Sequence, residues 1–307
     1  MRILFAGTAE IGAETLKALA ENFDVGLVLT NPDKPKGRSK KLVPSPIKVI
    51  ANELGIDVLQ PDRLRGEALK EIASFHCDTL ICFAYGKIFG PKLLSMFSNG
   101  CYNIHPSRLP QFRGSSPIQY AILNNLELSA ITIQKLSLEV DSGDVLSTYD
   151  FQIDKTDTTL TISEKVARLS APFAVDTFKK LEEGTLSIYE QFGEISYTKQ
   201  FSKEDSFIDW NKSAREVSAQ IRAFYPWPKA STVFEEKTLF ILGVFDVIED
   251  SYPIPGVVIE KRKKQGIVIS CKEGAIIVNK LQQQGKKEMD FNSFLNGHKN
   301  LINSKLG

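Results

Sequence analysis

Short apolar runs alternate with amphipathic segments along the first half of the chain. The continuous apolar runs, at residues 2–6, 24–30, 79–84 and 100–104, have the pattern of strands buried on both faces of a parallel sheet. Segments with helical spacing lie between them, at residues 10–21, 45–54 and 66–75. Ser45 followed by Pro46 is typical of a helix start. This alternation predicts an α/β domain with a Rossmann-like, doubly wound, mostly parallel sheet, which binds ligands beyond the carboxyl ends of its strands.

The pattern changes after a long helix that we expect over residues 158–183. Before it, residues 131–151 predict two extended segments around a turn; after it come a polar stretch and a short helix at 213–224. The short β-rich runs that follow lie at 230–234, 238–246, 256–260, 267–271 and 275–282. They predict a smaller C-terminal β-barrel of the OB type. The expected domains are therefore a catalytic domain over 1–189, a linker over 190–206 and the OB-like domain over 207–307.

Composition agrees with a globular chain of two domains. The 307 residues are 42% hydrophobic and 24% charged. The N-terminus opens directly on a strand pattern, and no run of 18 apolar residues occurs, so we expect a soluble cytoplasmic protein. The four cysteines form no C-x-x-C pair, and the three histidines are too scattered to build a zinc site with them; these residues are Cys77, Cys82, Cys101, Cys271, His76, His105 and His298. We expect reduced, mostly buried thiols and no metal.

The spacing of the first glycines does not match a dinucleotide-binding fingerprint. Gly7 follows a strand and precedes a helix, but the next glycine is Gly12, so the G-x-G-x-x-G fingerprint is absent. The phosphate cradle that this motif would form is therefore missing, which argues against a nicotinamide-dependent oxidoreductase.

Three polar residues in loops rich in Pro and Gly suit acyl transfer without a metal. Asn103 can donate its amide N–H groups and His105 can donate when protonated, both toward a carbonyl oxygen that gains charge. Asp141, in the run Asp141-Ser-Gly-Asp144, could stabilise the imidazolium and relay a proton. Each residue alone also fits a structural role: a turn cap, a buried ring, and ordinary turn residues before a strand.

The surroundings of these residues resemble a known family. Residues 99–122 (NGCYNIHPSRLPQFRGSSPIQYAI) and 140–146 (VDSGDVL) are similar to the signature of the folate-dependent formyltransferases, in particular the branch that acts on methionyl-tRNA. Further similar segments follow in the order of that branch, at residues 5–19, 30–51, 83–94, 207–214 and 221–230. The resemblance therefore covers essentially the whole chain.

The resemblance implies transfer of the formyl group of 10-formyltetrahydrofolate to the amino group of methionine on initiator tRNA, by a monomer without a metal. It assigns Asn103 and His105 to the formyl oxyanion, and Asp141 to the activation of His105 and to proton transfer. The residues expected against the folate are Ser107, Arg108, Leu109 and Pro110, with Tyr85, Gly86 and Ile88 from the 83–88 segment. Two positions depart from the family pattern, since Arg108 replaces a usual Leu and Ala9 a usual Pro. Arg108 bears on how closely this loop packs on the folate.

The net charge of +1 gives no global sign of an RNA partner, so any such sign is local. Residues 34–41 carry five cations in eight positions, and we expect Pro35 and Gly37 to exclude regular structure there. The resemblance places this segment at the tRNA acceptor end, with Arg38, Lys40 and Lys41 as the expected phosphate contacts. A second basic run, at residues 261–264, fits a solvated hairpin tip.

Alternative functions remain open at this point. The formyl acceptor could be glycinamide ribonucleotide or a nucleotide-linked amino sugar, because the same three catalytic residues serve those transferases. The basic segment at 34–41 and the C-terminal β domain argue against the first, and the basic segment alone against the second. A hydrolase of the formyl-folate, or an inactive RNA-binding module, is the alternative from another class.

Overall fold

A computed structural model describes residues 1–36 and 41–307, and the chain divides into two compact units. The first unit comprises Met1–Pro117, Leu128–Phe151 and Ser163–Thr198; the second comprises Ile118–Glu127, Gln152–Ile162 and Lys199–Gly307. No helix among the described residues is both long and apolar enough to cross a membrane.

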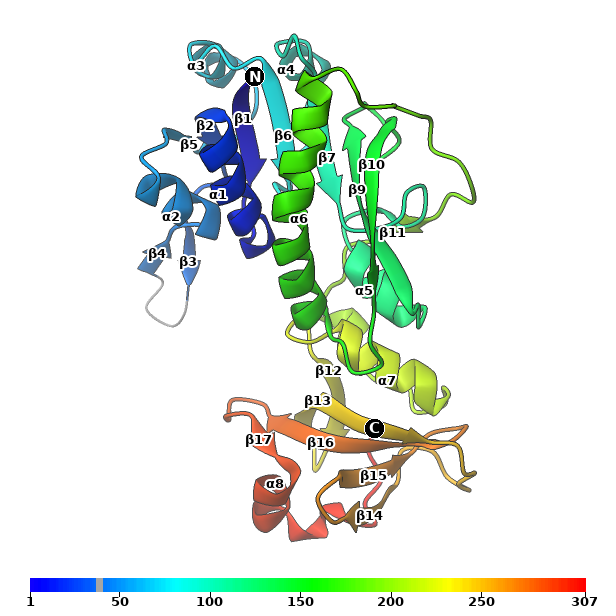
Figure 1. Ribbon diagram of the computed structural model, residues 1–307. Coiled ribbons are helices and arrows are strands. Elements are labelled where there is room, and N and C mark those ends of the chain that lie inside the picture. Colours follow the sequence, from blue (N-terminus) through cyan, green and yellow to red (C-terminus); the bar gives the residue numbers. More distant parts are fainter. Residues whose placement is uncertain (37–40) are drawn as a thin grey trace. The chain divides into compact units, whose positions relative to one another are not determined.

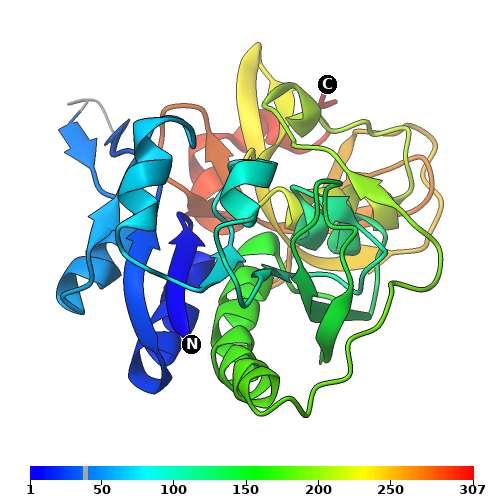
Figure 2. The same cartoon turned by 90° about the horizontal axis from the view of Figure 1, so that it is seen from above.

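The first unit is built on a seven-stranded, mostly parallel sheet (Figure 1). Its strands, in the order β10-β9-β7-β6-β1-β2-β5, are Val145–Gln152, Leu128–Lys135, Cys101–His105, Thr79–Phe83, Arg2–Gly7, Asp24–Leu29 and Val58–Leu59. The ladders that join β7, β6, β1, β2 and β5 are parallel, whereas β9 runs antiparallel to β7. Figures 1 and 2 show β1 and β2 side by side. Arg2 lies opposite Asp24 and Ile3 opposite Val25, and the register then shifts by one residue, so that Leu4 lies opposite Leu27. The mixed α/β class with a mostly parallel sheet is thus confirmed.

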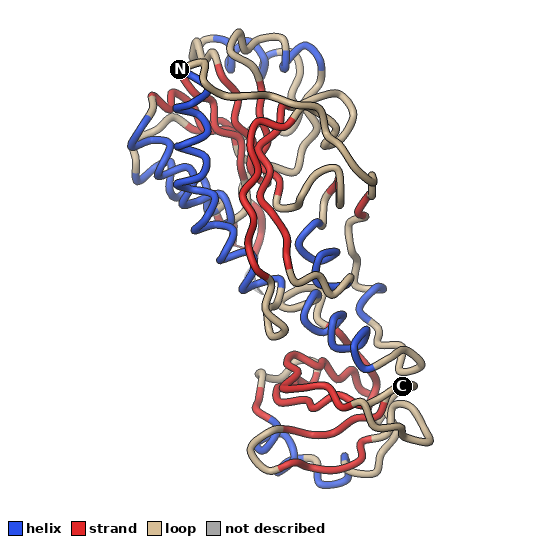
Figure 3. Tube along the Cα trace, turned by 45° about the vertical axis from the view of Figure 1, so that its right-hand side comes forward, coloured by secondary structure: helices blue, strands red, loops and turns tan. Residues whose placement is uncertain are grey.

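Helices cover both faces of this sheet, which explains its continuous apolar strands. They are α1 (Ala13–Asn22), preceded by a 3-10 turn at Glu10–Gly12, α2 (Pro46–Glu53), α3 (Glu67–Ala73), α4 (Pro91–Leu94) and α6 (Thr159–Glu182). Leu4 and Ala6 of β1 pack with Ile72 of α3 and Leu93 of α4. On the other face, Tyr102 of β7 meets Phe178 of α6 edge to face, with ring centroids 5.5 Å apart. Figure 3 shows the helical layer along one side of the sheet.

Ser45 caps α2 as its position before Pro46 predicts. Its side chain accepts a hydrogen bond from Lys48 N at 3.0 Å, and Pro46 occupies the first turn, where its missing N–H costs nothing. Just before this helix, Lys34–Lys36 (β3) pairs antiparallel with Lys41–Val43 (β4). The expectation of no regular structure in this basic segment is therefore wrong at its two ends. A two-stranded ribbon leaves outward-facing N–H groups unpaired, so Pro35 can take such a position opposite Leu42.

A short two-stranded ladder completes the first unit. Arg113–Gly114 (β8) pairs in parallel with Tyr197–Thr198 (β11), so the segment after α6 returns to the loop that follows β7. An isolated bridge between Val145 and Tyr189 fastens the other end of that returning segment.

The second unit contains an antiparallel sheet in the order β12-β13-β16-β15-β14, with β17 paired to β16. Its elements are α5 (Pro117–Leu123), η2 (Glu204–Ser206), α7 (Ala214–Ala223), β12 (Ala230–Phe234), β13 (Lys237–Ile248), β14 (Val258–Arg262), β15 (Gly266–Ser270), β16 (Ala275–Gln283), β17 (Met289–Asp290), α8 (Phe291–Gly297) and η3 (Lys299–Leu301). All five expected strands are present. In the described part of the chain no ladder joins the edge strands β12 and β14, so the sheet is open rather than a closed barrel.

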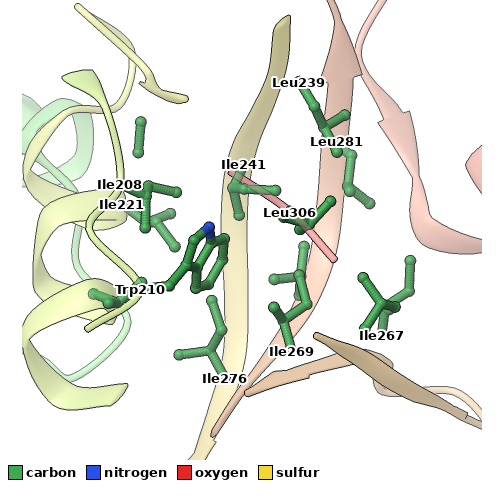
Figure 4. Packing of buried hydrophobic residues seen from close by; sticks show 14 of the residues in the cluster. Ile208, Trp210, Ile221, Leu239, Ile241, Ile267, Ile269, Ile276, Leu281 and Leu306 are labelled. Carbon is green, nitrogen blue, oxygen red and sulfur yellow. The ribbon is translucent and has the colours of Figure 1, made fainter. Parts of the chain in front are cut away.

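The core of the second unit lies between α7 and the sheet. Figure 4 shows Trp210, Ile221, Ile241 and Ile276 directed into one apolar cluster. The Trp210 indole is 5% exposed, and its Nε1 donates to Thr232 Oγ1 at 3.1 Å. Its buried N–H therefore has the partner that a core tryptophan needs, and Trp210 is a packing residue of this unit.

Candidate active site

Strands β7 and β9 present two pairs of polar side chains on one face of the sheet. In their antiparallel register Asn103 lies opposite Gln134, and His105 lies opposite Thr132. Residues opposite each other, and residues two apart on one strand, project from the same face. Asn103 and His105 are also at the carboxyl end of a strand of the parallel part of the sheet, where the fold class predicts ligand binding.

The carboxylate of Asp141 joins these residues into one site. Its Oδ1 accepts from Asn103 Nδ2 at 3.1 Å and from Gln134 Nε2 at 2.9 Å. Its Oδ2 accepts from the backbone N–H of Gly114 at 2.8 Å and lies 3.6 Å from His105 Nδ1. The Asp141 side chain is 11% exposed. Three N–H donors converge on a poorly exposed carboxylate, an arrangement suited to an ionised acceptor.

Both ring nitrogens of His105 face oxygen atoms. Nε2 lies 2.9 Å from the carbonyl oxygen of Phe112, and Nδ1 faces Asp141. A carbonyl oxygen only accepts, so Nε2 carries a hydrogen in this contact. Phe112 has a φ of +59°, a left-handed conformation that is strained for an aromatic residue and that accompanies the approach of its carbonyl to the ring. The site thus holds the imidazole between a backbone carbonyl and a carboxylate.

The turn that carries Asp141 depends on close backbone packing. Asp141 itself has a φ of +51°, a region that Asp tolerates better than most residues. A Cβ on Gly143 would lie 2.0 Å from the carbonyl oxygen of Lys135, so only glycine fits there. Asp144 takes no part in the site: its carboxylate is 3.6 Å from Lys135 Nζ, and both side chains are about half exposed. The spacing Asp141-Ser-Gly-Asp144 therefore serves to place the first aspartate.

Sequence reasoning missed two side chains of this site. Gln134 touches the Asp141 carboxylate directly, and Gln191 contacts the backbone of the same turn. A polar residue at position 134 within the buried strand Leu128–Lys135 was the available signal for the first. Gln191 lies in the polar stretch after α6 and gives no comparable signal, because only the return of that stretch to β8 brings it to the site.

The loop after β7 is mostly buried and internally bonded. Ser107 is fully buried, and its Oγ donates to the carbonyl oxygen of Gln111 at 2.6 Å, while Thr132 Oγ1 donates to the carbonyl oxygen of Ser107 at 2.7 Å. Leu109 is 8% exposed and Pro110 is buried as well. Arg108 differs, because its guanidinium is exposed and pairs with Asp150. Of the four residues expected against the folate in this loop, only Arg108 presents its side chain to solvent.

The segment after β6 shows the same division between support and surface. Tyr85 is 1% exposed and stacks on Phe89 in the core, with ring centroids 5.5 Å apart. Burial raises the pKa of its phenol, and Tyr85 Oη has no hydrogen-bond partner in the described part of the chain. Gly86 is exposed with a φ of +81°, and Ile88 is 83% exposed. Tyr85 therefore packs in the core and supports this segment, while Gly86 and Ile88 form its accessible surface.

Arg38 and Lys40, two of the three residues expected to bind tRNA, lie outside the described residues. Lys41, the third, is exposed at the start of β4. The second basic run forms a hairpin tip as expected, since Arg262 of β14 pairs with Gly266 of β15 and Lys263 and Lys264 are exposed in the turn.

The cysteines are free, and Cys82, Cys101 and Cys271 are buried as expected. Burial raises the pKa of each of these three thiols to about 12 and that of half-buried Cys77 to about 11. Among the residues that the structure describes, no group of three His, Cys, Asp or Glu side chains could hold a metal ion.

Comparisons with known proteins show the family of the chain. The sequence model of the formyl transferase family matches residues 1–177, and that of the formyl transferase C-terminal domain matches residues 200–299. The chain is 38% identical to the methionyl-tRNA formyltransferase of Lachnospira eligens, over 97% of each chain. It is 36% identical to that of Borrelia hermsii, over 98% of each.

A solved structure supports the fold over both units. A sugar 3N-formyl transferase, crystallised in the presence of dTDP and 5-N-formyl-THF, matches with a TM-score of 0.65 at 19% identity, over 94% of this chain and 99% of that one. At this identity the likeness concerns the fold alone. The family model covers more than half of the residues and the curated relatives cover nearly all of them, so the chain belongs to the formyl transferase family.

Proposed function

We propose that the chain transfers the formyl group of 10-formyltetrahydrofolate to the α-amine of methionine esterified to initiator tRNA, for translation initiation. The observation that carries this proposal is the convergence of Asn103, His105 and Gln134 on the carboxylate of Asp141 at a strand end. The tRNA acceptor is supported by the names of the relatives that are 36–38% identical over almost the whole chain.

Asn103 is the first donor to the formyl oxygen. When the amine attacks the formyl carbon, negative charge develops on that oxygen and positive charge on the attacking nitrogen. One amide hydrogen of Asn103 is directed at Asp141 Oδ1, which leaves the second for the oxyanion. The bond to Asp141 also fixes which way the amide points, because a carboxylate cannot donate.

His105 and Asp141 supply the second donor and the proton path. Since both ring nitrogens of His105 face acceptors, one N–H group must exchange its present acceptor for the formyl oxygen when substrate binds. The 3.6 Å between Nδ1 and Asp141 Oδ2 is longer than a hydrogen bond, and such catalytic contacts tighten in the substrate complex. Asp141 then stabilises the imidazolium and helps to move the proton from the amine to the departing folate nitrogen.

The folate lies against the loop after β7 and the segment after β6 in this proposal. Gly86, Ile88 and Arg108 have the exposure needed to touch it. The buried residues Tyr85, Ser107, Leu109 and Pro110 hold those two segments in place from behind. Arg108, paired with Asp150 at the surface, contributes the stem of its side chain rather than a buried charge.

The tRNA is bound through phosphate contacts of the basic segment at residues 34–41, by Arg38, Lys40 and Lys41. We assign catalysis to residues 1–189 and a further tRNA surface to residues 207–307. Residues 190–206 join them, and the part of this linker up to Thr198 belongs to the first compact unit. The open antiparallel sheet of the second unit fits an OB-type fold, a partly open barrel that commonly binds nucleic acid. We further propose that the protein acts as a monomer in the cytoplasm.

The proposal is tested by supplying the formyl donor with charged initiator methionyl-tRNA, glycinamide ribonucleotide, a nucleotide-linked amino sugar, or water alone, in parallel reactions. We expect formyl transfer to the charged tRNA and none to the small acceptors. Transfer only to a small acceptor would keep the chemistry and overturn the tRNA assignment. Release of tetrahydrofolate in water alone would indicate a hydrolase.

A further inference from the structure

Residues 189–198, which follow α6, pass along the turn that carries Asp141 and are hydrogen-bonded to the rest of the first unit at both ends. At one end Val145 N donates to the carbonyl oxygen of Tyr189 at 2.8 Å, and Tyr189 N donates back to Val145 at 3.1 Å. At the other end the segment pairs with β8 through the Tyr197–Thr198 strand. Between the two ends Phe192 is 97% exposed, while its neighbour Gln191 points inward. The segment therefore brings the side chain of Gln191 to the turn that carries Asp141.

The carboxamide of Gln191 holds the turn that carries Asp141. Its Nε2 lies 2.8 Å from the carbonyl oxygen of Asp141, 2.8 Å from that of Gly143 and 3.1 Å from Oε1 of Gln134. Two amide hydrogens are thus shared among three acceptors. Two of these acceptors belong to the turn, and the third belongs to the side chain that donates to Asp141 Oδ1.

A buried cation fixes the direction of this amide. Arg113 is 5% exposed, and its Nε and Nη2 lie 3.1 and 2.8 Å from Gln191 Oε1. A guanidinium only donates, so the atom of Gln191 that faces it must be the oxygen, and the NH2 group must face the turn. The orientation of Gln134 follows in the same way, because its NH2 faces a carboxylate and its oxygen faces Gln191.

We infer that Gln191 is a positioning residue of the active site, which acts through Asp141 and is itself oriented by Arg113. The hydrogen bonds run from the Arg113 cation through Gln191 and Gln134 to the Asp141 anion, and each member polarises the next. This inference rests on the proposed function, because its effect is measured in formyl transfer. Misplacing a catalytic group by about 1 Å costs up to about a hundredfold in rate.

The test uses two substitutions in the full-length protein. Gln191→Met keeps the length of the side chain and removes its hydrogen bonds, while Gln191→Glu keeps the shape and turns the donor into an acceptor that faces three oxygens. We expect kcat for formyl transfer to fall by about ten- to a hundredfold in both, with the KM for tRNA and the Kd for the folate within about twofold of wild type. Glu190→Gln, at the exposed neighbouring position, is the matched control and should change nothing.

A second measurement separates positioning from a general structural role. In an Asp141→Ala background, Gln191→Met should change the residual single-turnover rate by less than about threefold, because its target carboxylate is gone. The inference is overturned if Gln191→Glu has wild-type kcat, or if the loss from Gln191→Met is the same with and without Asp141. A wild-type enzyme that formylates no methionyl-tRNA would instead overturn the proposed function, which the control reaction reports directly.

Discussion

The turn that carries Asp141 and the ribbon formed by β3 and β4 are built in opposite ways. Asp141 is 11% exposed and held by three hydrogen bonds, and its turn is held by a further side chain. Lys41 of the ribbon is exposed at the start of a three-residue strand. Stabilising the charge that develops on a carbonyl oxygen needs hydrogen-bond donors fixed to within a fraction of an ångström. The attraction between a cationic side chain and a phosphate tolerates movement. We therefore expect sharp losses of chemical rate from changes at the first region and graded, salt-dependent losses of binding from the second.

The largest effect should come from Asn103→Ala. Loss of one oxyanion donor costs about 3 to 4 kcal/mol of transition-state stabilisation, or roughly a hundred- to thousandfold in kcat. Folate binding should survive, because the amide contributes to the transition state rather than to the ground state. Steady-state kinetics and folate titration check both points, with Asn52→Ala on the exposed face of α2 as the matched control. Turnover like that of wild type would show that Asn103 is not the donor.

Gly143→Ala should reduce kcat by about ten- to a hundredfold without touching any catalytic side chain. The added Cβ would lie 2.0 Å from the Lys135 carbonyl oxygen, so the turn must shift and carry Asp141 with it. Gly297→Ala adds the same methyl group where no atom lies within 4 Å apart from its chain neighbours and the backbone of its own helix, and should leave kcat unchanged. If both variants keep full activity, the turn tolerates displacement, and the contrast with the ribbon is weaker than we propose.

Replacement of Arg38, Lys40 and Lys41 by Ala should act on tRNA alone. Each lost phosphate contact lowers the slope of log affinity against log salt by about 0.7 to 0.9, so three together lower it by about two to three. The matched control removes the same charge from three exposed residues of the first unit, Lys70, Lys92 and Lys180, and should leave the slope as it is. Titration of tRNA binding between low and physiological salt measures both; equal slopes in the two variants would remove the ribbon from the interface.

The strands could be predicted from local pattern, and the grouping of Asn103, His105 and Asp141 could be predicted from the resemblance of the segments that contain them. Continuous apolar runs mark the strands of the parallel sheet that are buried on two faces. In the second unit, the short β-rich run at Ala230–Phe234 forms β12 with the expected bounds. The β3–β4 ribbon was missed, because Pro35 signals a break although a ribbon edge accepts proline. Gln191 could not be found from the sequence, since its role arises only when residues 197–198 pair with β8. Whether the second sheet closes into a barrel likewise depends on which edge strands pair with each other, a property of tertiary structure.

We propose that the site around Asp141 performs the chemical step and that the basic segment only binds tRNA. The most direct test is the single-turnover rate of formyl transfer for the variant in which Arg38, Lys40 and Lys41 are replaced by Ala. The reaction is run at concentrations of methionyl-tRNA and 10-formyltetrahydrofolate that saturate that variant. Our account predicts a chemical rate within about twofold of wild type, because the hydrogen-bonded site around Asp141 is unchanged. A rate that stays tenfold or more below wild type at saturation would contradict it, since the ribbon would then contribute to the chemical step.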